Sequence, residues 1–254
     1  MDEIFGCVSF RRCLSSVTMG AIIDTASSIL ALAEHRVTVS AQNLANISTG
    51  GYKRRVDFAR ILAIGQSATE PTPNEAGVTD FSAGKPVDTG NPYDLALTGP
   101  GFFVVRGGDA LFYTREGQFR RDEEGRLLTA QGLILQAQGG GDLVLRQTAL
   151  DLAADGTVIE QGEPVARLAI VDFADLKALR RAEGGAFAAP ENMAVELERP
   201  SVRQGMLEAS NVSTGEEMVA MMETLRRAES GQRLVQVYDD LMGRALCTFG
   251  QAQP

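Results

Sequence analysis

The sequence has one histidine, no tryptophan and three cysteines among its 254 residues, and each scarcity argues against a class of site. With His35 alone, a two-histidine metal site is impossible, and no G-x-S-x-G motif accompanies it to indicate a serine hydrolase. The lack of tryptophan removes the usual platform for sugar stacking. Cys7, Cys13 and Cys247 lack metal-ligand spacing, and their odd number argues against a disulfide framework. We therefore expect no catalytic residue, no cofactor and no metal.

Positive charge is also scarce, because the net charge is −9 and no basic cluster exceeds a few residues. Binding to nucleic acid or to an anionic membrane surface needs a cationic face, so both are disfavoured. No apolar run reaches the roughly 18 residues that a membrane-spanning helix needs, and we expect no membrane insertion. A hydrolase using two carboxylates stays open as an alternative, because 33 acidic residues always supply some pair.

Residues 1–18 open with two acids and place Arg11 and Arg12 after a weakly apolar segment. A secretory signal has the opposite order, with positive charge ahead of the apolar stretch. We therefore predict that no signal peptide is cleaved. Residues 1–18 are interpreted as a disordered extension, or as an alternative start ahead of Met19.

The clearest periodicity lies in residues 20–47, where apolar and small residues recur at alternating spacings of three and four. This heptad spacing predicts a long helix with one stripe suited to packing against another helix. Gly50 and Gly51 are predicted to end it, as glycine does at helix C-termini. The stripe comprises Ile23, Ala26, Leu30, Ala33, Val37, Ser40, Leu44 and Ile47.

A second long helix is predicted near the other end of the chain, over residues 214–248. Thr214 is a suitable N-cap, and Glu216 and Glu217 lie in the first turn, where the helix dipole favours acids. A stripe again follows spacings of three and four, and Val235 and Met242 widen it. The stripe comprises Met218, Met221, Leu225, Ala228, Leu234, Tyr238, Leu241 and Ala245.

Between these helices, short apolar runs alternate with glycine turns, which predicts antiparallel strands. The clearest candidates are residues 95–97, 102–105, 111–114 and 166–173, with a helical turn at 174–183. The expected fold class is α+β, with long N- and C-terminal helices, paired like a coiled coil, flanking a mainly antiparallel β domain. The expected domains are a helical polymerisation domain (19–52 with 206–248), a transition (53–85) and a β-rich domain (86–205).

The two helical stripes have two interpretations. A heptad stripe commonly packs a helix on its own domain, which would suit a β-rich surface binding module. The stripes here lie at opposite ends of the chain, on either side of a complete β domain, so pairing with each other alone leaves apolar surface uncovered. We therefore favour a non-enzymatic, self-assembling subunit whose neighbours cover the stripes.

Three ordered motifs carry a family resemblance. Residues 41–53 read A-Q-N-L-A-N-I-S-T-G-G-Y-K, which resembles the A-N-N-[LI]-A-N-x-[NS]-T-x-G-[FY]-K signature of the bacterial flagellar rod and hook axial proteins. Residues 205–212 and 217–219 resemble the C-terminal signature of that family, and residues 91–105 and 113–119 resemble its core. The motif residues carried over are Asn43, Leu44, Ala45, Asn46, Thr49, Gly51, Tyr52, Lys53, Leu207, Glu208, Ser210, Asn211 and Val212.

The resemblance implies a structural subunit of the flagellar basal body, most similar to the proximal rod, with the distal rod and hook as alternatives. It further implies export in an unfolded state through the flagellar type III apparatus, and assembly with copies of itself and with other rod proteins. Asn43, Asn46 and Asn211 would then fix the register between subunits, or simply cap backbone groups locally. The sequence departs from the family pattern at Gln42, Gly215 and Ala228.

Overall fold

The computed structural model describes residues 27–56, 78–147 and 150–250, so the predictions for residues 1–18, Ile23 and Ala26 lie outside the described residues. The chain divides into two compact units. Residues 27–42 and 215–250 belong to the first, called the helical unit. Residues 43–214 form the second, called the β-rich unit. Residues 43–52 and 206–214, expected in the helical domain, fall in the β-rich unit, as does Lys53, expected in the transition.

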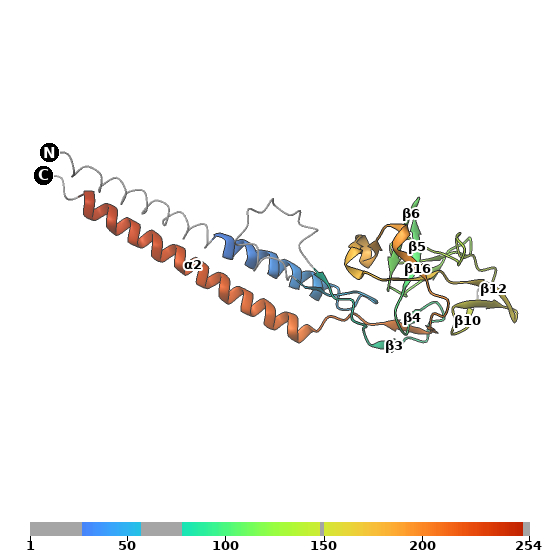
Figure 1. The fold of residues 1–254 in the computed structure, drawn as a ribbon. Coiled ribbons are helices and arrows are strands. Elements are labelled where there is room, and N and C mark those ends of the chain that lie inside the picture. Colours follow the sequence, from blue (N-terminus) through green and yellow to red (C-terminus); the bar gives the residue numbers. More distant parts are fainter. Residues whose placement is uncertain (1–26, 57–77, 148–149, 251–254) are drawn as a thin grey trace, which may run out of the picture. The chain divides into compact units, whose positions relative to one another are not determined.

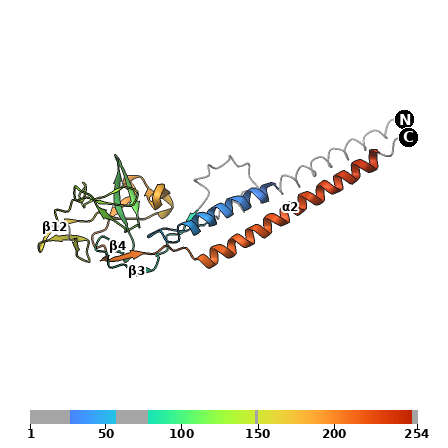
Figure 2. The ribbon, with the colours of Figure 1, turned by 180° about the vertical axis from the view of Figure 1, so that it is seen from behind.

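The helical unit contains two long helical segments (Figures 1 and 2). The N-terminal helix is described from residue 27 and ends at residue 45, a few residues before Gly50. The second helix, α2 (Thr214–Gly250), has 37 residues and carries Glu216 and Glu217 in its first turn, as predicted. It runs unbroken through Gly231. At 1.5 Å per residue it is about 55 Å long.

The β-rich unit is built from short antiparallel strands, as the glycine-punctuated sequence predicts. The strands are β1 (Arg55–Val56), β2 (Val78–Thr79), β3 (Pro86–Asp88), β4 (Leu95–Leu97), β5 (Phe102–Gly107), β6 (Ala110–Thr114), β7 (Arg120–Arg121), β8 (Leu127–Leu128), β9 (Ile134–Leu135), β10 (Asp151–Leu152), β11 (Thr157–Glu160), β12 (Glu163–Arg167), β13 (Ile170–Phe173), β14 (Arg180–Arg181), β15 (Phe187–Ala188), β16 (Ala194–Glu196), β17 (Val202–Gln204) and β18 (Met206–Glu208). Three 3-10 turns are also present, η2 (Leu176–Ala178), η3 (Glu183–Gly185) and η4 (Glu191–Met193).

The main sheet follows the order β14-β15-β6-β5-β9-β8-β7, and β13 joins it beside β5 with β16 at its other edge. Strand β5 is buried on both faces because successive side chains point to opposite sides of a sheet. Phe103 and Val105 enter one core cluster, while Phe102 and Val104 enter the other. This double burial explains why β5 reads as a continuous apolar run.

Smaller sheets complete the β-rich unit: β10-β11-β12, β1-β2, β17-β4 and β18-β3. The predicted strand at 166–173 is instead two strands, β12 and β13, which pair with different partners. The predicted helical turn at 174–183 is present only in part, as the 3-10 turn η2, because residues 180 and 181 form β14. The pairing of β18 with β3 brings the C-terminal motif beside residues 86–88, and this positions the site described next.

Candidate functional site

Three segments far apart in the sequence meet inside the β-rich unit: the loop at 50–55, the turn after β6, and β18. The Gly51 amide donates to the Glu208 carbonyl oxygen at 2.7 Å, and the Asn211 amide donates to the Tyr52 carbonyl at 3.3 Å. The N-terminal motif therefore lies along the C-terminal motif through backbone hydrogen bonds. Each of the three segments belongs to a motif that the sequence had marked separately.

A buried charge cluster joins these segments. Lys53 Nζ lies 2.6 Å from Glu208 Oε1, with the two side chains 2% and 4% exposed. Arg115 Nη1 donates to the other carboxylate oxygen of Glu208 at 3.2 Å. The Gly84 amide also donates to Glu208 Oε1, at 2.8 Å, and Lys53 Nζ donates to the Ser82 carbonyl at 2.8 Å. Glu208 is thus the single anion that two cations and one amide share.

Burial sets the electrostatics of this cluster. Desolvation lowers the pKa of Lys53, and hydrogen bonding and attraction to Glu208 act against that lowering. Desolvation likewise lowers the pKa of Arg115, opposed chiefly by attraction to Glu208. Both cations consequently depend on one carboxylate to offset the cost of leaving water.

Two asparagines bracket the same loop with side-chain hydrogen bonds. Asn43 accepts from the Arg55 amide and donates to the Arg55 carbonyl, both at 2.9 Å. Asn211 accepts from the Arg54 amide at 2.6 Å and donates to the Asp80 carbonyl at 2.8 Å. These asparagines bridge segments within the chain, which goes beyond the local capping alternative; a role between subunits stays a prediction.

Close backbone approach explains the glycines of the site. Gly51 has φ +67°, and a β-carbon there would overlap the Arg115 backbone. A β-carbon on Gly84 would overlap the Ala209 carbonyl oxygen. Because both positions leave no room for a side chain, glycine is needed for the three segments to pack this closely.

A third cation, Arg181 on β14, covers the loop from the side. It donates to the Lys53 carbonyl, and its guanidinium lies 4.7 Å from the Tyr52 ring centroid and 5.4 Å from that of Phe187. Burial lowers the pKa of Arg181. Tyr52 in turn donates from its hydroxyl to Asn43 at 3.3 Å.

The predicted motif residues differ in burial, and most are shielded. Buried are Asn43, Gly51, Tyr52, Lys53, Glu208 and Val212; half-buried are Leu44, Asn46, Thr49, Leu207, Ser210 and Asn211; Ala45 is exposed. Sequence reasoning gave no role to three residues of the site, Gly84, Arg115 and Arg181. Arg115 lies inside one of the recognised motifs, so a search for charged residues in the motifs could have found it.

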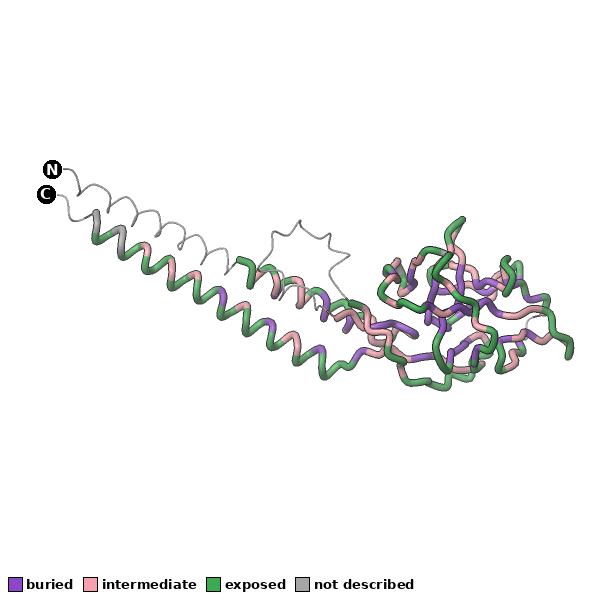
Figure 3. The backbone as a smooth tube through the Cα atoms, in the orientation of Figure 1, coloured by how far each residue is buried: buried purple, intermediate pink, exposed green. Residues whose placement is uncertain are grey.

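The predicted helix residues also differ in exposure. Buried or half-buried are Leu30, Ala33, Val37, Leu44, Ile47, Met221, Val235 and Tyr238; exposed are Met218, Leu225 and Leu241. The most shielded line of α2 combines large apolar residues with small and polar ones, and burial alternates along the helix (Figure 3). This line, called the shielded line, comprises Glu217, Met221, Thr224, Ala228, Gly231, Val235, Tyr238 and Met242.

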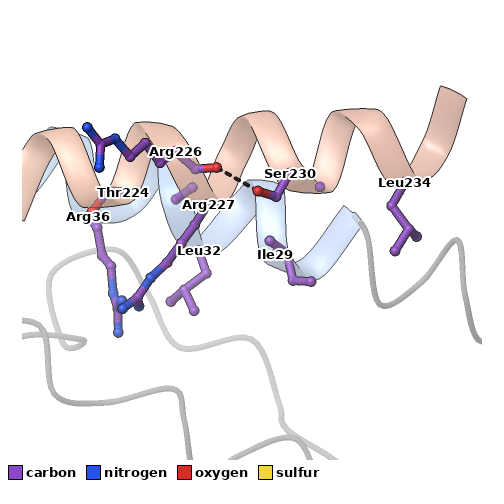
Figure 4. Close-up of a pocket in the computed structure, with 10 residues that line it drawn as sticks. Ile29, Leu32, Arg36, Thr224, Arg226, Arg227, Ser230 and Leu234 are labelled. Atoms are coloured by element: carbon purple, nitrogen blue, oxygen red, sulfur yellow. Dashed lines mark hydrogen bonds between the residues drawn. The ribbon is translucent and has the colours of Figure 1, made fainter.

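A groove of about 520 Å³ lies between the two helices of the helical unit. Both helices line it, and its lining contains three arginines and no acidic residue. Figure 4 shows Ile29, Leu32, Arg227 and Leu234 pointing to the same side of the helix pair. A β-carbon on Gly231 would lie 3.4 Å from Ile29 Cγ2, so the helices approach closely there.

Residues 27–56, 78–147 and 150–250 contain no group of three or more histidine, cysteine or acidic side chains placed to hold a metal. Within the same ranges, no helix combines the length and apolar character required to cross a bilayer.

Comparison with known proteins gives two family models and full-length relatives. Residues 203–246 match the flagellar basal body rod FlgEFG protein C-terminal model, and residues 96–163 match the flagellar hook protein FlgE/F/G D1 domain. The flagellar basal-body rod protein FlgF of Salmonella typhimurium is 32% identical over 250 residues, covering 89% of this chain and 97% of the relative. FlgF of Caulobacter vibrioides is 29% identical over 224 residues (84% and 91% covered). FlgG of Borreliella burgdorferi is 28% identical over 253 residues (87% and 96% covered).

These matches extend over both the helical ends and the β-rich middle, and they agree with the meeting of the three motifs at one buried site. The family consists of structural proteins of the basal body that assemble with other rod components. This chain belongs to the flagellar basal-body rod protein family and is a structural subunit of the rod.

Proposed function

We propose that the chain is a proximal-rod subunit that polymerises through its terminal helices, with copies of itself and other rod proteins as neighbours. The observation that supports this is the surface of α2. Seven of its large apolar side chains remain about half exposed, from 48% for Met218 to 60% for Leu241. Surface apolar residues scattered singly are ordinary, whereas repeated stripes of them mark an interaction surface.

The two helices are further proposed to pair as an antiparallel coiled coil within one chain. In this arrangement the shielded line of α2 faces the N-terminal stripe, and one helix runs up in residue number as the other runs down. The pairs are Leu30 with Gly231, Ala33 with Ala228, Val37 with Thr224, and Ser40 with Met221. Large residues then face small ones at both ends of this series. The approach of Leu30 Cδ2 to 3.8 Å from a β-carbon on Gly231 supports the first pair.

The assignment to the proximal rod, with the distal rod and hook as alternatives, rests on the short middle of the chain. A hook-type subunit carries a large insertion, whereas here the described residues between β5 and β16 form only the main sheet and the small sheet β10-β11-β12. The stretch at 165–173, spanning the end of β12 and all of β13, also supports the proximal assignment. We further propose that the subunit is not an enzyme, and that the flagellar export apparatus secretes it without cleavage of a signal peptide.

This proposal assigns a different role to each of the two units. The helices carry polymerisation, and the Lys53–Glu208–Arg115 cluster closes the β-rich unit. Limited proteolysis of the unassembled chain is expected to leave a stable fragment bounded near residues 43 and 214. A fragment trimmed past Lys53 or Glu208 would contradict this boundary, since both are buried.

The proposal is tested by disrupting one stripe while leaving the fold intact. Leu225→Asp is expected to abolish incorporation into rods, with the circular dichroism of the unassembled chain unchanged. Val219→Asp is the matched control, because Val219 is also an exposed apolar residue of α2 but lies about 200° around the helix from the shielded Glu217, and it is expected to incorporate normally. Deletion of residues 19–50 or 214–248 is expected to abolish assembly while the β-rich unit still folds. Rods built from either truncated chain would refute the proposed function.

A further inference from the structure

Apart from Val219, the large exposed apolar side chains described in α2 form two separate stripes on opposite sides of its shielded line. Members of the first, called stripe A, each follow a shielded residue by one position: Met218, Met222 and Leu225 follow 217, 221 and 224. Members of the second, called stripe B, each precede a shielded residue by one: Leu234, Val237 and Leu241 precede 235, 238 and 242. Because neighbouring residues on a helix differ by about 100°, the two stripes lie on opposite flanks.

Each stripe also continues into one charged residue, and the two charges are of opposite sign. Glu229 follows the shielded Ala228 by one position and continues stripe A, whereas Arg244 lies three positions after Leu241 and continues the three-and-four spacing of stripe B. Both side chains are exposed, and neither forms an ion pair within the described part of the chain. Stripe A therefore reads apolar, apolar, apolar, acid, and stripe B reads apolar, apolar, apolar, base.

We propose that stripe A of one copy docks on stripe B of the next copy, with their α2 helices parallel. The inference rests on the proposed self-assembly and specifies its contact. Equivalent members of the stripes are 16, 15 and 16 residues apart, and Glu229 and Arg244 are 15 apart. At 1.5 Å per residue, adjacent copies are staggered by about 24 Å along the helix. Because the stripes differ, the contact is head-to-tail, and its stagger prevents closure into a flat ring.

The groove between the helices extends this contact. Leu234 belongs to stripe B and also lines the groove with Ile29 and Leu32. The stagger places Met218 of the neighbouring copy at the level of Leu234. Methionine is unbranched and flexible, so its side chain suits an irregular apolar groove.

Cysteine pairs test the register directly. The full-length chain, with Cys7, Cys13 and Cys247 replaced by serine, carries Leu225→Cys and Leu241→Cys and is produced in place of the native protein. After mild oxidation of isolated basal bodies, we expect a disulfide-linked ladder of this subunit. The matched control, Met218→Cys with Leu241→Cys, places the thiols about two helical turns further apart and is expected to give at least tenfold less product.

The possible outcomes distinguish an error in the proposed contact from an error in the proposed self-assembly. Linkage in the control equal to that of the 225/241 pair, or linkage of Leu225→Cys alone to itself, would overturn the proposed register while leaving self-assembly intact. Failure of differently tagged copies to co-purify in basal bodies would refute self-association, and the contact with it. Charge reversal is the second arm: Glu229→Arg or Arg244→Glu alone is expected to reduce incorporation about tenfold, and the double reversal to restore it. A double variant as poor as either single one would overturn the pairing.

Discussion

Removing the carboxylate of Glu208 is the most informative single perturbation of the β-rich unit. Glu208→Ala deletes the acceptor shared by Lys53, Arg115 and the Gly84 amide. Lys53 is 2% exposed and Arg115 8%, so both positive charges stay buried without an anion. Lys53 is able to lose its proton at moderate cost, but a guanidinium is not. The change therefore leaves at least one uncompensated buried charge.

Breaking a buried ion pair from one side typically costs about 3–5 kcal/mol. For a unit of this size, that corresponds to a fall in Tm of roughly 6–20 °C, measured by thermal unfolding of the full chain. Lys53→Met is expected to cost less, because Glu208 keeps its hydrogen bonds from Arg115 and Gly84. The control is Glu124→Ala, which removes an acid 69% exposed and paired with Arg126, and should cost under about 1 kcal/mol.

The pH dependence gives a sharper test. Desolvation holds the pKa of Lys53 below 10.5, and Glu208 raises it. Without Glu208 the folded-state pKa falls further, while the unfolded chain still titrates near 10.5. At pH values between these two pKa values, Lys53 carries its proton in the unfolded chain but not in the folded variant. The free energy of unfolding of the variant therefore rises with pH in this range. The loss caused by Glu208→Ala should therefore shrink as pH approaches 10.5. A loss of stability no larger than that of Glu124→Ala, or a loss of stability that grows with pH, would refute this explanation.

Three further predictions concern single positions. Gly51→Ala should destabilise by several kcal/mol in urea unfolding because its β-carbon meets the Arg115 backbone, whereas Gly90→Ala, at the same φ of +67° but in open space, should cost only about 1 kcal/mol. Burial raises the pKa of Glu116 from 4.5 to about 7, so stability should fall by about 3 kcal/mol from pH 4.5 to 7; Glu116→Gln should abolish that fall. Gly231→Ala should stabilise the helices by about 1 kcal/mol, seen by circular dichroism, because its β-carbon meets only ordinary contacts from 3.4 Å.

Local patterns were sufficient to predict the type and order of the main elements. Phe102–Val105 forms a strand because four consecutive branched or aromatic residues suit a pleated surface buried on both sides. The acids at 216 and 217 marked the first turn of α2 because the helix dipole acts within one turn. The division of 166–173 into β12 and β13 depends on two different pairing partners, and single-strand propensity carries no information about these.

The buried cluster could be predicted only in part, because its members are distant in sequence. Lys53 and Glu208 were both recognised as motif residues, yet 155 positions separate them, and 33 acids offered as many partners. Their pairing depends on the loop at 50–55 lying along β18, which the Gly51–Glu208 backbone bond fixes. Such a bond leaves no trace in the composition of either segment.

The stripe of α2 shows a different limit of periodicity. Selecting apolar residues at spacings of three and four combined Met221, Val235 and Tyr238, which are half-buried, with Met218 and Leu225, which are exposed. Only half of the line that α2 shields consists of large apolar residues, and the rest includes a glutamate, a threonine and a glycine. Hydrophobicity therefore marked exposed positions of α2 as strongly as shielded ones.

This distribution has an energetic consequence for assembly. A contact between stripe A and stripe B covers six side chains that are already about half buried, so each contributes about 0.8–1.5 kcal/mol, or roughly 5–9 kcal/mol in total. Association itself costs about 4–15 kcal/mol, so one such contact in isolation is marginal. A subunit added to an existing rod meets neighbours on both flanks and gains two contacts for one association cost. The chain should therefore stay monomeric alone at micromolar concentration and add to preformed rods, which sedimentation with and without rod fragments measures; stable free dimers would contradict this argument.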